Sequence, residues 1–171
     1  MDNDILLTSI FSASIEFGIG CIKNLADRVR DFNISKALIV ADKGIIKAGI
    51  LDKVLGNLDK SDIEYTIFDN VQLNPIDKNV MDGLEVYREN RCNAIIGVGG
   101  GSPIDVAKAI RVVVTHPGHI SNYYSPDKIT EEMPPIIAIP TTSGTGTEVS
   151  TGGIITDTGD NRKRVVRSGP P

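Results

Sequence analysis

The sequence predicts an α/β fold, in which a parallel sheet carries helices on both faces and a β-hairpin follows near the C-terminus. Short apolar runs alternate with segments of helical spacing between residues 34 and 139, which is the pattern of a parallel sheet covered by helices. The runs at 37–41, 94–98 and 136–139 are continuously apolar, as in strands buried on both faces. We therefore expect a Rossmann-like sheet.

The first half of the chain gives a regular series of elements. Residues 11–17 alternate between apolar and polar side chains, which predicts a half-buried strand. Helical spacing over 22–32 and the strand 37–41 follow. Apolar side chains then recur at every fourth position from Ile46 to Leu58, which predicts one continuous helix face.

The second half continues the alternation. A strand at 65–68 precedes the chain break at Asn74-Pro75, and a helix is marked by Val80, Leu84 and Tyr87. The remaining elements are the strand 94–98, a helix over 103–115, irregular chain over 121–135, the strand 136–139, a Gly/Thr-rich loop over 141–148, and a hairpin formed by 153–156 and 163–166.

Composition places the chain among ordinary soluble domains. Of its 171 residues 40% are hydrophobic and 23% are charged, and the formal net charge is −4, which leaves no electrostatic footprint for nucleic acid. The basic run at 162–164 is interpreted as a solvated face. No apolar run approaches the ~20 residues of a membrane span and no signal peptide is visible, so we expect a cytoplasmic protein without a membrane partner.

The cysteines and histidines show no metal-binding or disulfide pattern. Cys21 and Cys92 lie far apart within apolar patterns, and we expect both to be small buried residues. His116 and His119 are separated by Pro117-Gly118, which argues against a helical ligand pair and favours a surface loop. No nucleophile–base pair can be assigned.

The most informative stretch is the glycine run between the strand 94–98 and the following helix. Gly99, Gly100 and Gly101 have no β-carbon, so an anion could approach their backbone amides closely. We expect Ser102 to cap the helix, Pro103 to be its first residue and Asp105 to lie in its first turn. Such a helix N-terminus binds phosphate, although the glycines could also form only a tight connection.

Other polar residues follow neighbouring strands, and ligands bind beyond the carboxyl ends of parallel strands. Asp42 follows the strand 37–41 and could accept hydrogen bonds from ribose hydroxyls, which disfavours a 2′-phosphate; it could equally be a turn or helix cap. Thr141, Thr142 and Thr145 could contact base and ribose, or form a capped turn. The set suits a dinucleotide.

The chain resembles the iron-containing (group III) alcohol dehydrogenases. The resemblance covers essentially the whole chain, and residues 77–92 look like the 1,3-propanediol dehydrogenase branch. It rests on Gly-Val-Gly-Gly-Gly-Ser-Pro-Ile-Asp-Val-Ala-Lys (97–108) and Ile-Pro-Thr-Thr-Ser-Gly-Thr-Gly-Thr-Glu-Val (139–149), with support from Phe17-Gly18 with Gly20, from residues 37–43 and from Asn74-Pro75.

The resemblance implies an oxidoreductase with two domains, in which the N-terminal domain binds NAD or NADP. It implies hydride transfer between a small primary alcohol or diol and the nicotinamide, with a divalent iron or zinc ion on an all-helical C-terminal domain. It assigns NAD rather than NADP through Asp42, and it adds Asn74 in the cofactor cleft and Lys163 near the nicotinamide ribose. The cofactor-binding candidates are then Asp42, Asn74, Gly99, Gly100, Gly101, Ser102, Asp105, Thr141, Thr142, Thr145 and Lys163.

The family's metal ligands have no counterpart in this sequence, and neither His116 nor His119 matches one. We therefore expect residues 1–171 to be an N-terminal NAD-binding domain that lacks the metal domain and is inactive alone, from an enzyme that is a homo-oligomer at full length. The alternatives are a non-catalytic nucleotide-binding module, a glycerol-dehydrogenase-like enzyme and a dehydroquinate-synthase-like lyase; residues 141–149 argue against the lyase.

Overall fold

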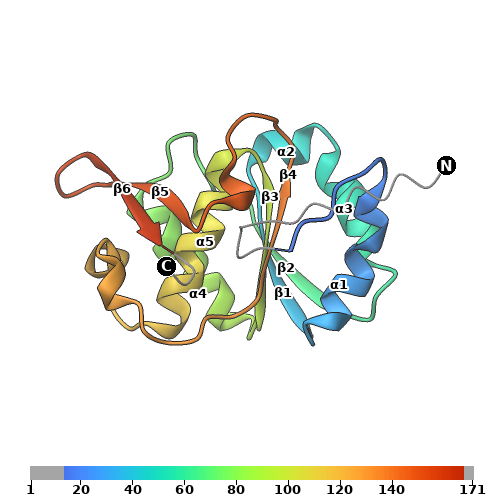
Figure 1. The fold of residues 1–171 in the computed structure, drawn as a ribbon, viewed down its shortest axis with the longest axis horizontal. Coiled ribbons are helices and arrows are strands. Elements are labelled where there is room, and N and C mark those ends of the chain that lie inside the picture. Colours follow the sequence, from blue (N-terminus) through green and yellow to red (C-terminus); the bar gives the residue numbers. More distant parts are fainter. Residues whose placement is uncertain (1–13, 168–171) are drawn as a thin grey trace.

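The core of the molecule is a four-stranded parallel sheet (Figure 1). A computed structural model describes residues 14–167. The strands are β1 (Lys36–Val40), β2 (Glu64–Phe68), β3 (Ala94–Gly99) and β4 (Ile136–Pro140), in the order β2-β1-β3-β4. All three strand pairings are parallel, which confirms the predicted parallel sheet, and the order places β1 and β3 at the centre.

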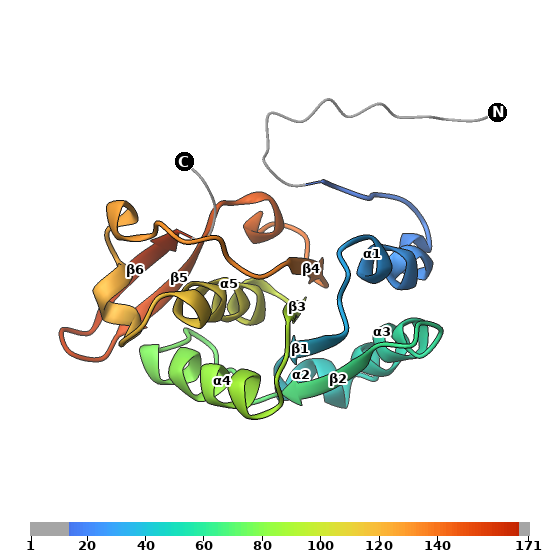
Figure 2. The same ribbon diagram turned by 90° about the horizontal axis from the view of Figure 1, so that it is seen from below.

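Helices cover both faces of the sheet, as the apolar strands require. Figure 2 shows α1 (Leu25–Asp31) and α3 (Ile50–Leu58) on one side, and α4 (Asp77–Glu89) and α5 (Gly101–Thr115) on the other. Alternate side chains of β1 divide between two cores: Ile39 packs with the α1/α3 layer and Leu38 packs with the α4/α5 layer. Each central strand is therefore buried on both faces, which explains its continuous apolar sequence.

A separate two-stranded hairpin lies against α5. It consists of β5 (Gly152–Asp157) and β6 (Arg162–Arg167), which pair antiparallel. Ile155 and Val166 are fully buried under it. A β-carbon at Gly153 would lie 2.5 Å from the Asp105 carbonyl oxygen, so the hairpin reaches the α5 backbone only because this residue has no side chain.

The strand predicted at residues 11–17 is wrong where it can be checked. Residues 11–13 lie outside the described part, and residues 14–17 form no strand. Phe17 is 86% exposed, so its alternating pattern does not mark a buried face here. The helix expected over 22–32 is observed as a 3-10 turn, Cys21–Asn24, followed by α1. Cys92 is buried as predicted, whereas Cys21 is only partly covered.

Two further predictions need correction. The helix expected from Ile46 to Leu58 is divided into α2 (Lys43–Lys47) and α3, because Gly49 adopts a left-handed conformation with φ of 65°. The strand β4, predicted to be buried, is only half-buried, since it pairs with β3 alone among the described strands and lies at the edge of the sheet.

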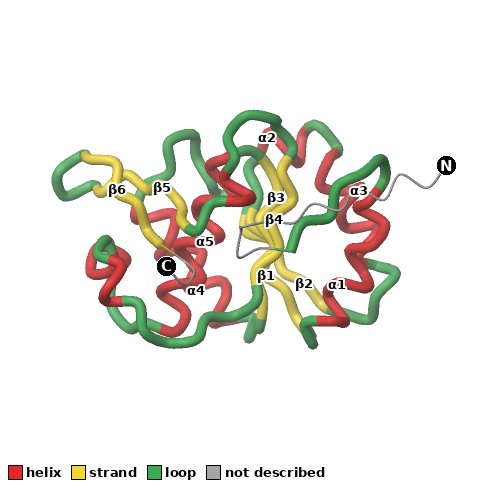
Figure 3. The backbone as a smooth tube through the Cα atoms, in the orientation of Figure 1, coloured by secondary structure: helices red, strands yellow, loops and turns green. Residues whose placement is uncertain are grey.

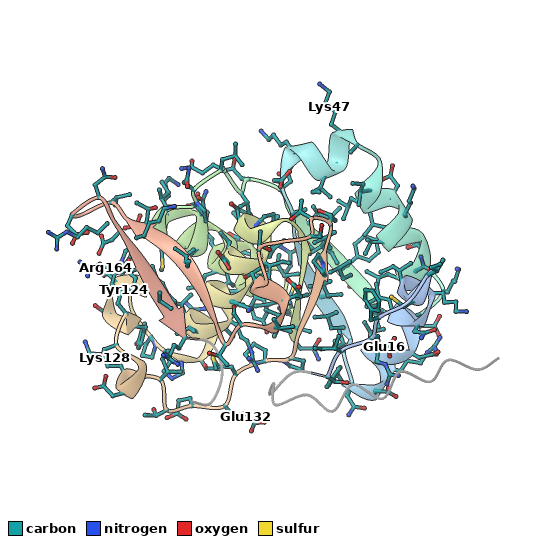
Figure 4. The ribbon with its side chains drawn as sticks, turned by 45° about the horizontal axis from the view of Figure 1, so that its top comes forward. Glu16, Lys47, Tyr124, Lys128, Glu132 and Arg164 are labelled. Atoms are coloured by element: carbon teal, nitrogen blue, oxygen red, sulfur yellow. The ribbon has the colours of Figure 1, made fainter. Side chains whose placement is uncertain are left out.

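The irregular segment after α5 is held by a histidine that was expected on the surface. His116 is buried, and its Nε2 accepts hydrogen bonds from the backbone N–H groups of Thr130 and Glu131 at 3.0 and 3.1 Å. In Figure 4, Tyr124 from this segment lies beside Arg164 of the hairpin, whose guanidinium is 5.6 Å from the Tyr124 ring centroid.

Between residues 14 and 167, no helix is long and apolar enough to cross a membrane.

Candidate functional site

The candidate site lies at the carboxyl edge of the sheet. Figure 3 shows the loops that follow β1, β3 and β4 at the same upper edge. The chain leaves β1 toward β2, and β3 then lies on the other side of β1, so the strand order reverses between β1 and β3. Open α/β sheets bind ligands at such a reversal.

The helix that begins at this reversal starts earlier than the sequence suggested. α5 starts at Gly101, with Gly100 as an N-cap that provides no side-chain hydrogen bond. Ser102 is thus not the cap, Pro103 is the third residue rather than the first, and Asp105 lies beyond the first turn. Gly100 and Gly101 permit the early start because they have no β-carbon, and Pro103 is tolerated since its nitrogen needs no intrahelical partner there.

The uncapped start of α5 faces the loop after β4. Thr141 N–H donates to the Gly99 carbonyl at 2.9 Å, which ties the two loops together. A β-carbon at Gly100 would lie 3.3 Å from Thr142 Oγ1, and one at Gly101 would lie 3.4 Å from Thr145 Cγ2. The first amides of α5 have no intrahelical acceptors, so this cradle of amides and hydroxyls is open to an anion.

Two hollows adjoin the start of α5, and each has a volume of about 430 Å³, within the range of ligand pockets. The first hollow lies between the ends of β1, β2 and β3. Its walls include Asp42, Lys43, Asp69 and Ser102. Asp42 Oδ1 accepts a hydrogen bond from Ile45 N–H at 3.0 Å and caps α2, so the cap alternative holds while the second carboxylate oxygen can still accept hydrogen bonds.

The second hollow lies between the start of α5, the loop after β4 and the hairpin. Its walls include Asn74, Gly101, Ser102, Asp105, Thr145 and Lys163. Lys163 Nζ donates to Asn74 Oδ1 at 3.2 Å, which brings together two residues 89 positions apart. Ser102 belongs to both hollows, so an elongated ligand could occupy both across the helix N-terminus.

Two charged side chains of α5, Asp105 and Lys108, hold one wall of the second hollow through hydrogen bonds. Thr147 Oγ1 donates to Asp105 Oδ1, and Lys108 Nζ donates to the Thr147 carbonyl. Burial raises the pKa of Asp105, while the Thr147 hydroxyl, the Ile154 amide and the Lys108 charge partly oppose it. Burial likewise lowers the pKa of Lys108, against the attraction of Asp105 and then Glu148.

We expect the free energy of unfolding to depend on pH through the ionisation of Asp105. Its raised pKa means that the folded chain holds this proton more tightly than the unfolded chain. Its contribution to the free energy of unfolding is therefore complete below the ordinary pKa of 3.8 and is lost as the pH rises through the folded-state pKa. Relative to Asp105→Asn, the wild type should lose stability as the pH rises above the ordinary carboxyl pKa of 3.8.

Urea unfolding of both proteins across this pH range measures the difference. Asp52→Asn, which alters an exposed carboxylate in α3, provides the baseline. A wild-type advantage that grew with pH would contradict the expected sign.

The hollows bring together most of the predicted site residues. Gly99, Gly100, Thr141 and Thr142 form the cradle beside them rather than their walls. Sequence reasoning expected the loop after residues 65–68 along this edge but named none of residues 69–73, which line the first hollow. It also did not name as site residues four residues that line the second hollow, Thr147, Ser150, Ile154 and Thr156. The position of loop 69–73 directly after a strand was the available signal. Lys108 was also missed, although it falls on the apolar face of its helix.

The same part of the chain offers no set of metal ligands. Across residues 14–167, no group of three or more His, Cys, Asp or Glu side chains could hold a metal ion. The His116 ring contacts the backbone through both nitrogens, and His119 Nδ1 lies 2.9 Å from Ser121 Oγ. The described residues therefore do not fit a metal centre.

Solved structures are similar to this chain in fold and in sequence. The structure of a 1,3-propanediol oxidoreductase matches with a TM-score of 0.85 and 42% identity, covering 89% of this chain and 40% of that one. A sulfoacetaldehyde reductase from Bifidobacterium kashiwanohense, solved in complex with NAD+, matches with a TM-score of 0.80 and 28% identity, covering 92% of this chain and 42% of that one.

Named dehydrogenases also match this chain in sequence. The chain is 43% identical over 146 residues to a choline dehydrogenase of Bacillus subtilis, covering 84% of this chain and 36% of that protein. It is 42% identical over 154 residues to a 1,3-propanediol dehydrogenase of Citrobacter freundii, covering 89% of this chain and 40% of that protein. The chain thus spans about two fifths of the length of these relatives, and the 1,3-propanediol branch is among its near relatives.

The family model for iron-containing alcohol dehydrogenases matches residues 12–170. This match includes both glycine-rich loops and every residue that lines the two hollows. The chain belongs to the iron-containing alcohol dehydrogenase family.

Proposed function

We propose that this chain is the NAD-binding N-terminal domain of a metal-dependent alcohol dehydrogenase. In the whole protein it would serve hydride transfer between a small primary alcohol or diol and NAD(P). The observation that carries the proposal is the pair of adjoining hollows that meet at Ser102, across the uncapped start of α5. A dinucleotide has the matching shape, with two nucleoside halves joined by a pyrophosphate.

The residues present fit this cofactor. The amides of Gly101 and Ser102 would bind the pyrophosphate, since they lie at the positive end of the helix dipole and Gly101 has no side chain to shield its amide. The first hollow would hold the adenosine half, with the Asp42 carboxylate on the ribose hydroxyls. Asn74, Thr145 and Lys163 would surround the nicotinamide half, which supplies the hydride acceptor when NAD is bound.

The described residues do not by themselves supply alcohol activation, because they form no metal-ligand set. The family resemblance implies that the metal ligands would lie on a second domain. The role we propose for these residues is to bind and orient the cofactor and to separate its two halves.

We expect the chain to prefer NADH to NADPH because the Asp42 carboxylate would repel a 2′-phosphate. Asp42→Asn removes the charge but retains an N-capping side chain for α2, so the fold should be unaffected. The dissociation constant for NADPH divided by that for NADH should fall about tenfold, which corresponds to about 1.4 kcal/mol.

Calorimetric titration of wild type and variant with NADH, NADPH and ADP tests the proposal. Tighter binding of NADH than of ADP supports a dinucleotide site over a general nucleotide site. A wild-type chain that bound neither ligand, or an unchanged NADH-to-NADPH ratio in Asp42→Asn, would count against it.

A further inference from the structure

The buried lysine of α5 makes an unusual set of contacts. Lys108 is only 5% exposed. Its ammonium donates to the carbonyl oxygens of Thr147 and Ser150, to Ser150 Oγ at 3.0 Å and, more weakly, to the Gly152 carbonyl at 3.4 Å. All of these acceptors lie in the six residues between the loop after β4 and the start of β5.

A buried ammonium is unfavourable unless its donors are satisfied. Burial lowers the pKa of Lys108, which shows that the charge is held here against its desolvation. The attraction of Asp105 and Glu148 opposes this effect, while the hydrogen bonds of the ammonium go to three backbone carbonyls and one hydroxyl. Carbonyls can converge on one point only if the backbone curves around it, so the ammonium fixes the path of the chain from 147 to 152.

This curved segment forms part of the second hollow. Thr147, Ser150 and Gly152 line it, and Thr145 lies just before the segment. Asp105, one helical turn before Lys108, accepts from the Thr147 hydroxyl on the same side. Two charged side chains of α5 thus attach this wall to the helix that begins at the cradle.

We propose that Lys108 is a positioning residue for the cofactor, whose ammonium holds the 145–152 wall at the distance that the nicotinamide half requires. This inference rests on the proposed function. It differs from a general structural role because it predicts an effect on one half of the ligand only: the first hollow shares no wall with the segment 145–152.

Lys108→Met tests the inference, since methionine keeps much of the apolar stem but lacks the ammonium. We expect the dissociation constant for NADH to rise about tenfold, which corresponds to about 1.4 kcal/mol, and that for ADP to stay within about twofold. Hydrogen exchange should become faster in amides 145–152 and remain unchanged in β1 and β3. Lys78→Met, which removes an exposed lysine of α4 paired with Asp82, is the matched control.

Ser150→Ala provides a second variant that keeps the lysine and removes one acceptor. It should weaken NADH binding in the same direction by a smaller factor. Equal losses of NADH and ADP affinity in Lys108→Met would overturn the inference in favour of a general structural role, as would unchanged NADH affinity beside a wild type that binds. Failure of the wild type to bind NADH would instead overturn the proposed function.

Discussion

Gly101→Asp should abolish measurable NADH binding and leave the fold intact. The new carboxylate would lie at the start of α5, where the proposed site holds the pyrophosphate. Two like charges about 4 Å apart repel by about 4 kcal/mol at a partly exposed site, which corresponds to about a thousandfold in affinity. The fold should tolerate the change, because a β-carbon at Gly101 would make an ordinary contact of 3.4 Å with Thr145 and an acidic residue suits the first turn of a helix.

Isothermal titration with NADH and thermal unfolding by circular dichroism separate the two effects. Gly101→Ala adds the β-carbon without the charge, so it should weaken binding much less. If Gly101→Asp bound NADH as tightly as the wild type, the pyrophosphate would not lie at this helix N-terminus.

Gly97→Val should destabilise the chain by about 3 kcal/mol, at the upper end of typical overpacking effects. Gly97 lies in β3 at the centre of the sheet, where α5 crosses closely. A β-carbon there would lie 3.0 Å from Ala107 Cβ and 3.2 Å from Ile104 Cα, and the backbone of a packed helix cannot move aside easily. Valine would add two methyl groups at the same point.

Urea denaturation measures this change, and Gly56→Ala serves as its control. Gly56 is exposed in α3 and has no atom within 4 Å of an added β-carbon, so alanine there should stabilise the helix by about 0.5–1 kcal/mol. A loss below about 1 kcal/mol in Gly97→Val would mean that α5 shifts freely on the sheet.

The sheet could be predicted from sequence because each central strand has to be apolar on both sides. The runs at 37–41 and 94–98 satisfy this condition. Short runs that are apolar at every position are typical of strands buried on both faces. The order of the strands and the hollows at their ends follow less directly. They depend on right-handed connections and on loop paths such as 69–73, whose composition carries no distinctive signal.

The failures have physical causes as well. Ser102-Pro103 is a good local start for a helix, but Gly100 and Gly101 allow the helix to begin two residues earlier against β3. The alternating pattern at 14–17 has no neighbouring strand among the described residues to pair with it. His116 and Lys108 are polar residues whose partners are backbone groups far along the chain, and a sequence pattern does not show such partners.

The hairpin has one more consequence for the proposed site. Among the described residues β5 and β6 form a sheet of their own, and outside it β5 makes only an isolated bridge from Thr156 to Ile76. The hairpin is therefore attached to the main sheet mainly through its packing on α5. The second hollow lies where the hairpin meets the start of α5, whereas the first is lined by the loops that follow β1 and β2 and by Ser102. A ligand bound in the second hollow would contact both the hairpin and the start of α5. Its binding would therefore couple the unfolding of the hairpin to that of the main sheet, and the cooperativity of unfolding would depend on the ligand concentration.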